Sequence, residues 1–421
     1  MFSKHYVRKS IFNLGEYLIA LSLILHGRTI WSVIPSMSEI FTYVNLLMLV
    51  IGVLLCLFSK RTLYIKNCTH CLALIALVAL YFIFYILITN YNHLSVIRTM
   101  IACCILFVYV NLCRSDKEPL SVLVKYKNLI AVVVVISLFF WLFGSQLNVI
   151  KPNVHVYSSW SKSYVSGYFG IYFEPQYVEA IFFDGFILRN CAIFAEAPMC
   201  AFQFGVALLI EVFLCKKPSN ILFVIYTLGL LTTVSTMGYV IVIGVVVMRF
   251  LMFKPKKQAG KIIKSLVVLL SVVFGFVAAY LVFSKLDSSS GNIRMDDFMA
   301  GYLAWQDNVL FGNGFNNIDA IIKHMSSWRI TEQGFSNSIF QILSDGGLYL
   351  ASFYIVSFVR GLYFARIYRN LKSFIFIIFF MFMFVITIVS YTNITFCILI
   401  LMLKGNLSYK ENVKTAKTAS L

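Results

Sequence analysis

The chain consists mostly of long apolar runs separated by short polar segments over its 421 residues. A helix needs roughly 20 mainly apolar residues to cross the hydrocarbon core of a bilayer, and most of these runs approach that length. The pattern therefore predicts spanning helices at 11–26, 40–58, 71–89, 99–112, 129–147, 198–214, 265–283 and 337–359.

Two further apolar stretches, 221–253 and 373–403, are too long for one span and short for two. The positive-inside rule decides between the possibilities, because Lys and Arg concentrate in cytoplasmic loops. If each stretch forms two short helices, with turns at 235–238 and near 391–393, roughly three-quarters of the 35 Lys and Arg lie on one side. The sequence thus predicts about 12 transmembrane helices with both termini in the cytoplasm.

The composition agrees with a membrane protein. Hydrophobic residues make up 60% of the chain and charged residues only 12%, whereas roughly a quarter of the residues of a soluble domain are charged. The net charge of +18 alone would suit nucleic-acid binding. Because the basic residues concentrate in segments predicted to be cytoplasmic, the charge reports topology instead, and we expect contact with membrane lipid and no nucleic-acid partner.

Two of the predicted outside loops are long, at 148–197 and 284–336. The other outside connections are short, and loops of such length in a compact protein are usually functional. We therefore predict that 1–421 forms a single all-α polytopic membrane domain with its chemistry in two large loops on one face.

Few basic residues lie on the outer side, and four of them are arginines within or beside the outside loops: Arg98, Arg189, Arg294 and Arg329. A guanidinium group stays charged and has a planar fork of donors that matches phosphate oxygens. These arginines could bind a diphosphate, or they could form salt bridges with acids of the same loops.

Other side chains in this region allow more than one interpretation. Gly312 and Gly314 permit a close backbone approach or a tight turn. Asp345 falls in the outer part of a predicted span, where an acid is costly and usually functional or paired. The adjacent Asp296 and Asp297 could bind a metal ion, but a solvated loop surface explains such a pair more often.

Together these features resemble the superfamily of O-antigen polymerases (Wzy) and O-antigen ligases of bacterial inner membranes. In that family the first large loop ends with an Arg before a Phe-x-Glu-Pro-like pattern, and the second has an Arg, a Trp and a Gly-x-Gly. The next span begins with a His-Asn or similar pair, followed by an acid and a Gly. The matching residues are Arg189, Phe194, Glu196, Pro198, Arg294, Trp305, Gly312, Gly314, Asn337, Phe340, Asp345 and Gly347, although Ala197 is interposed between Glu196 and Pro198.

The helix pair around 233–238 also looks like the Ser-x-x-Gly stretch of the family, and the first half of the chain matches only in the number of spans. A second Phe-Glu-Pro, at 173–175, has no Arg just upstream and is set aside.

The resemblance implies a GT-C-like multi-span glycosyltransferase that uses no cofactor and no metal ion. Donor and acceptor would both be oligosaccharides linked to undecaprenyl diphosphate. An inverting transfer at the periplasmic face of the bacterial inner membrane would join repeat units of the O-antigen, and a chain-length regulator protein is a possible further partner.

Residue roles follow from the same resemblance. Diphosphate binding is expected from Arg189, Arg294 and Arg329. For catalysis, Glu196 is the first candidate for the general base and His324 the second, while Asp345 would orient the arginines or the acceptor sugar. Substrate positioning is expected from Gly312, Gly314, Ser336 and Asn337.

Two alternatives stay open. One is an O-antigen ligase, or a polymerase of capsule or exopolysaccharide, in the same superfamily. Ligases usually have His where this chain has Ser336, which favours a polymerase. The other is a flippase or transporter of lipid-linked sugars. Transporters tend to have repeated halves, which this sequence lacks, and its long loops on one side favour chemistry at that face.

Overall fold

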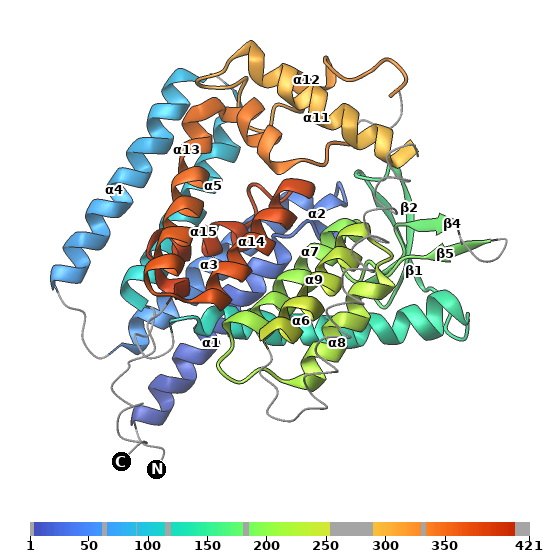
Figure 1. Cartoon of the computed structure of the whole chain (residues 1–421), viewed down its shortest axis with the longest axis horizontal. Helices are drawn as coiled ribbons and strands as arrows, with labels where there is room; N and C mark the ends of the chain where they lie inside the picture. The colour runs from blue at the N-terminus through green and yellow to red at the C-terminus, as the bar shows by residue number, and fades with distance from the viewer. Residues whose placement is uncertain are drawn as a thin grey trace.

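The computed structural model describes residues 4–60, 65–89, 91–113, 119–179, 185–252, 289–329 and 334–408, and these are mostly helical (Figure 1). Within them, six helices are long and apolar enough to cross a membrane. They are Ser38–Ser59, Cys68–Ile88, His93–Cys113, Ser121–Gln146, Ala197–Leu214 and Ser338–Ile367. The chain is therefore a multi-pass membrane protein.

The helices of the first half are α1 (Lys4–Leu25), α2 (Ile30–Val33), α3 (Ser38–Ser59), α4 (Ile65–Ile88), α5 (His93–Val108) and α6 (Ser121–Phe140). Those of the second half are α7 (Ala197–Leu209), α8 (Asn220–Thr232), α9 (Thr236–Met252), α11 (Ser289–Asp307), α12 (Ile318–Ile322), α13 (Ser338–Ile367), α14 (Leu371–Ile386) and α15 (Asn393–Leu403). Short π-helical segments extend α5, α6 and α7 at Tyr109–Cys113, Trp141–Gln146 and Ile210–Leu214.

Both long apolar stretches divide into two helices, as the charge distribution predicts. The first breaks between α8 and α9, where Val234 has a φ of 47°, and the second breaks between α14 and α15. Four of the apolar helices, α8, α9, α14 and α15, have only 10–17 residues. The span expected at 265–283 lies outside the described residues, so the total of 12 spans stays a prediction.

Helix α7 lies at the centre of the bundle. Its sequence is apolar on nearly every side, which is typical of a helix enclosed by protein, and all its residues except Pro198 are buried. Helices α6, α8, α9 and α14 pack around it. Glu196 has an extended backbone directly before α7, and Pro198 lies in its first turn, where proline costs no hydrogen bond. Glu196 is thus fixed at the end of a buried helix.

The first large loop contains strands, which corrects the all-α prediction for this part of the chain. An antiparallel sheet joins β1 (Val154–Ser158), β2 (Ser163–Tyr168) and β3 (Tyr172–Phe173), and a hairpin joins β4 (Tyr177–Glu179) and β5 (Phe186–Leu188). The many Val and Tyr residues here favour strands, but a search for spans does not detect segments this short. The second large loop forms α11 and α12 at one end of the molecule, away from the start of α1 (Figure 1).

We expect both large loops to face the periplasm. A cysteine introduced at the exposed Ser161 or at Lys323 should react with a membrane-impermeant maleimide in intact cells. The matched control is Lys217→Cys, on the side predicted to be cytoplasmic, which should react only after the inner membrane is permeabilised. Labelling of the Lys323→Cys variant only after permeabilisation would contradict the topology.

Candidate functional site

Arg189 is fixed where the first large loop meets the break between α8 and α9. Its Nε donates to the carbonyl oxygen of Thr233 at 3.0 Å, and the backbone N–H of Asn190 donates to that of Thr232 at 3.0 Å. These carbonyl groups end α8, so they lack partners in a further turn and carry partial negative charge. The helix break therefore helps to hold the guanidinium group.

Gln176 connects Arg189 to the start of α7. Its side-chain oxygen accepts from Arg189 Nη1 at 3.4 Å and from the backbone N–H of Ala197 at 2.9 Å. Its carbonyl oxygen accepts from the backbone N–H of Arg189 at 3.0 Å. Gln176 was not among the residues predicted from the sequence, although it directly follows the Phe-Glu-Pro at 173–175.

The two large loops contribute to one electrostatic environment. Burial lowers the pKa of the Arg189 guanidinium, the charge of Glu196 raises it, and the positive charge of Arg294 lowers it. Arg294 lies on α11, and no hydrogen bond or ion pair joins it to another described residue. The charges of Glu196 and Arg294 thus act on Arg189, and Gln176 bonds both to Arg189 and to the residue after Glu196, but no hydrogen bond or ion pair joins Arg189 to Glu196 or Arg294 in the described structure.

Glu196 forms an ion pair with Arg28, a residue that sequence analysis missed. The distance from Arg28 Nη1 to Glu196 Oε1 is 3.0 Å, and the two side chains are 20% and 13% exposed. The guanidinium of Arg28 also lies 4.0 Å from the ring centroid of Trp160 in the first loop. The signal for Arg28 was its place among the few basic residues on the predicted outer side, where the positive-inside rule makes Lys and Arg uncommon.

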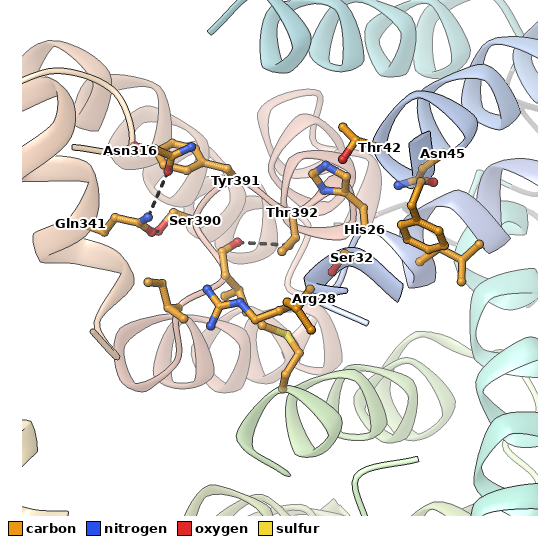
Figure 2. Close-up of a pocket in the computed structure, with 16 residues that line it drawn as sticks. His26, Arg28, Ser32, Thr42, Asn45, Asn316, Gln341, Ser390, Tyr391 and Thr392 are labelled. Atoms are coloured by element: carbon orange, nitrogen blue, oxygen red, sulfur yellow. Dashed lines mark hydrogen bonds between the residues drawn. The ribbon is translucent and has the colours of Figure 1, made fainter. Parts of the chain in front are cut away.

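A cavity of about 300 Å³ lies beside this ion pair (Figure 2). Segments far apart in sequence form its walls: the residues after α1, the start of α3, the loop before α12, the start of α13 and the turn before α15. A second cavity of about 150 Å³ shares four wall residues with it: His26, Thr42, Asn316 and Tyr391. In the predicted topology all these segments lie at the outer face.

Asp345 supports the wall of the larger cavity from behind. It is 1% exposed, and its Oδ2 accepts from the hydroxyl of Tyr391 at 2.8 Å. Its carbonyl oxygen accepts from the hydroxyl of Tyr85 at 2.7 Å. Asp345 therefore acts on the cavity through Tyr391, as a positioning residue, and it makes no hydrogen bond to Arg189 or Arg294 in the described structure.

Gly312 and Gly314 let the second loop lie directly against a kink in α13. Their φ angles are 68° and 105°, which L side chains rarely adopt. A Cβ on Gly312 would lie 2.4 Å from the carbonyl carbon of Asp345. The backbone N–H groups of Asn313 and Gly314 donate to the carbonyl oxygens of Ser344 (2.7 Å) and Asp345 (3.0 Å). Both glycines thus support the segment that holds Tyr391.

Arg329, which follows α12, forms a buried ion cluster with two acids of α11. Its guanidinium pairs with Asp297 and, at 3.3 Å, with Asp296, and Ser336 Oγ donates to Asp297 Oδ2 at 2.6 Å. This is the salt-bridge alternative of the sequence analysis. Arg329 was expected to contact a diphosphate, and Ser336 the substrate. The structure does not favour these roles, because both side chains already bind acids of α11.

His324 and Asn337 also have local partners. His324 Nε2 lies 2.8 Å from Asp307 Oδ2, and Lys323 Nζ lies 2.6 Å from the same oxygen. Hydrogen bonds from these two side chains lower the pKa of the Asp307 carboxyl. The side chain of Asn337 accepts from the backbone N–H of Phe340 at 3.0 Å and so caps α13. Neither His324 nor Asn337 lines the two cavities.

Because the ion cluster of Arg329 is buried and the ion pair of Lys323 is exposed, we expect replacement of Arg329 to lower the stability of the second loop much more than replacement of Lys323. Arg329→Ala should destabilise the loop by roughly 3–5 kcal/mol, because it leaves buried carboxylates without a partner. Lys323→Ala is the matched control: its side chain is 54% exposed, and such pairs contribute about 0–1 kcal/mol. Thermal unfolding and protease resistance of the detergent-solubilised variants measure the difference. Equal losses for both variants would contradict a structural role of Arg329.

Comparison with protein families gives one match. Residues 221–355 match a family model described as O-antigen ligase (Wzy_C). The matched part runs from α8 through the second large loop into α13, and it includes Arg294 and Asp345, whereas Arg28, Arg189 and Glu196 precede it. No curated protein matches the chain.

Proposed function

The chain belongs to the O-antigen ligase and polymerase superfamily, and on this premise we propose that it is a polymerase of lipid-linked repeat units. Members of this superfamily are glycosyltransferase-like membrane enzymes. Both substrates would be oligosaccharides linked to undecaprenyl diphosphate, and the reaction would occur at the periplasmic face of the inner membrane. The growing chain would leave its own lipid diphosphate and join a new repeat unit.

The bond changes define what the site must do. An acceptor hydroxyl oxygen attacks the anomeric carbon of the donor, and the bond from that carbon to the diphosphate breaks. The electron pair leaves with the diphosphate, and the hydroxyl proton moves to a base. Because the diphosphate is a good leaving group, the enzyme chiefly has to position the substrates and stabilise the developing negative charge.

The observation that carries the proposal is that Arg189, held at the break between α8 and α9, lies within electrostatic range of Arg294 on the other large loop. Two like charges near each other in a partly buried place repel, and a bound diphosphate would remove this repulsion. Hydrogen bonds to Thr233 and Gln176 orient Arg189, so its guanidinium group is already positioned before the substrate binds. Such preorganised donors stabilise charge without reorganisation during the reaction.

Glu196 is the better of the two candidates for the base. It lies in the electrostatic environment of Arg189 and contacts Arg28, which lines the larger cavity. His324 instead forms a partly exposed pair with Asp307, away from both cavities. A base must reach the acceptor proton, and Glu196 joins the arginine pair to the cavity.

A ligase is the second candidate, because the matching family model is described as O-antigen ligase. The two activities differ in what a deletion strain accumulates. Loss of a polymerase should leave surface polysaccharide with a single repeat unit, whereas loss of a ligase should leave long polymer on the lipid carrier. Loss of a flippase should instead retain single units on the cytoplasmic face.

The direct test uses purified full-length protein and lipid-linked repeat units. We expect a ladder of polymer lengths on the lipid carrier. Absence of the ladder, together with long carrier-linked polymer in the deletion strain, would reject the polymerase in favour of the ligase.

A further inference from the structure

We infer that the larger cavity, the one beside Arg28, binds the acceptor saccharide through its uncharged hydroxyl groups. The inference rests on the proposed function, because it assigns the acceptor side of the same site. Glu196 connects the two sides: it forms an ion pair with Arg28 at the cavity and contributes to the electrostatic environment of Arg189. A saccharide in this cavity would therefore lie near the proposed base and near the arginines that receive the leaving diphosphate.

The charge of the walls favours an uncharged sugar. No Asp or Glu is among the residues that line either cavity, and Arg28 is already paired with Glu196. Most of the polar lining of the larger cavity consists of hydroxyl and amide groups, at Ser32, Thr42, Asn45, Asn316, Gln341 and Ser390. Hydroxyls and amides both donate and accept hydrogen bonds, as the hydroxyl groups of a sugar do. A lipid chain could not use the hydrogen-bonding capacity that these groups have left. The one Arg that lines the larger cavity is paired with an acid, whereas Arg98, which lines the smaller cavity, bonds among the described residues only to the hydroxyl of Tyr43.

The orientation of His26 gives the cavity a fixed donor. The backbone N–H of Asn393 donates to His26 Nδ1 at 3.3 Å, which places the proton of the neutral ring on Nε2. His26 lines both cavities, and Figure 2 shows its ring between Thr42 and Thr392. The Nε2–H group can therefore donate to a ligand at the junction of the two cavities.

The opposite wall is held by hydrogen bonds within the protein. Gln341 Nε2 donates to Asn316 Oδ1 at 3.4 Å, and Ser390 Oγ donates to Gln341 Oε1 at 2.7 Å. Figure 2 shows these three side chains together, across the cavity from Thr42 and Asn45. Tyr391 is fixed next to them by Asp345. A wall that is ordered before binding reduces the entropy lost on binding.

Two buried amides in the walls have acceptor capacity left over. Asn45 lines the larger cavity and Asn393 the smaller one, and each is 2% exposed. The side-chain oxygen of each has no hydrogen-bond partner among the described residues. Buried polar atoms nearly always have a partner, so these two oxygens are a second, independent sign of a site that receives hydrogen-bond donors.

The test measures binding of a probe that lacks the diphosphate. The probe is the free repeat oligosaccharide, released by mild acid from the lipid-linked units of the same cell. Full-length protein in lipid nanodiscs should bind it, and His26→Ala and Gln341→Ala should each weaken binding about tenfold, the size expected for one well-placed hydrogen bond. Equilibrium dialysis with labelled oligosaccharide gives the dissociation constants.

The matched control is Gln306→Ala. Gln306 is an exposed glutamine on α11 with one side-chain partner, the hydroxyl of Tyr302 at 2.7 Å, and it lines neither cavity. Its replacement should leave binding unchanged. Arg189→Ala should also leave binding of this probe unchanged, because the probe has no diphosphate. Thermal unfolding of each variant verifies that it is folded.

Three outcomes separate this inference from the proposed function. Equal binding by the wild type and both cavity variants would overturn the saccharide site, and so would absence of binding to the wild type. Binding that is lost only in the cavity variants, in a protein that makes no polymer from lipid-linked units, would keep the saccharide site and reject the polymerase.

Discussion

Replacing Arg189 or Arg294 by Ala is expected to abolish polymer formation while the protein remains in the membrane. If both guanidinium groups bind the diphosphate, each variant loses charge stabilisation in the transition state, and removal of one such donor typically lowers the rate by about 10²–10³-fold. Lys should restore little activity, because an ammonium group cannot make the two parallel hydrogen bonds of a guanidinium. Polymer length and yield from purified lipid-linked units measure the effect.

The double variant tests whether the two arginines act on the same group. Residues that bind one diphosphate act as a unit, so Arg189→Ala with Arg294→Ala should lose little more activity than either change alone. Because Arg189 also donates to Thr233 and Gln176, protein abundance and thermal unfolding have to be compared with those of the Lys variant. Near-normal polymer from the Arg294→Ala variant would reject the assignment.

The sequence predicts features that depend on local pattern or on charge. The two helix breaks follow from the distribution of Lys and Arg, because the alternative would place lysines on the wrong side of the membrane. Gly312 and Gly314 were expected to permit a close approach or a turn; Gly312 lies against the backbone of Asp345, and the N–H of Gly314 donates to its carbonyl oxygen. A common site for Arg189, Glu196 and Arg294 was predicted only from the resemblance to a family, because the residues themselves are separated in the sequence.

Features that depend on tertiary packing could not be predicted. His26, Asn316 and Gln341 are far apart in the sequence and come together only because the end of α1, the loop before α12 and the start of α13 meet. Neither the hydropathy pattern nor the spacing of residues predicts that these segments contact one another. Arg329 shows the converse case: its residue type and its position in the second loop suit a diphosphate, but in the structure it forms ion pairs with Asp296 and Asp297. Whether such an arginine binds a ligand or forms an internal ion pair can be decided only from the three-dimensional structure.

Glu196→Gln is expected to lower the rate of polymer formation by about 10²–10⁴-fold, the usual contribution of a general base. The amide keeps the size and shape of the side chain but cannot accept the proton of the acceptor hydroxyl. The fold should tolerate the change, because the side-chain oxygen of Gln can still accept the hydrogen bond that Arg28 Nη1 donates to Glu196 Oε1 at 3.0 Å. Single-turnover rates with lipid-linked units measure the loss.

Arg28→Ala distinguishes a base from a partner in an ion pair. If Glu196 accepts the proton, it can still do so without Arg28, so this variant should lose about tenfold at most and mainly in KM for the acceptor, since Arg28 lines the cavity. Glu196→Gln should act on kcat instead. If the two variants lost activity equally and in the same parameter, Glu196 would serve only to hold Arg28, and the base would have to be sought among the other residues that line the cavity, with His26 first because it lies at the junction of both cavities.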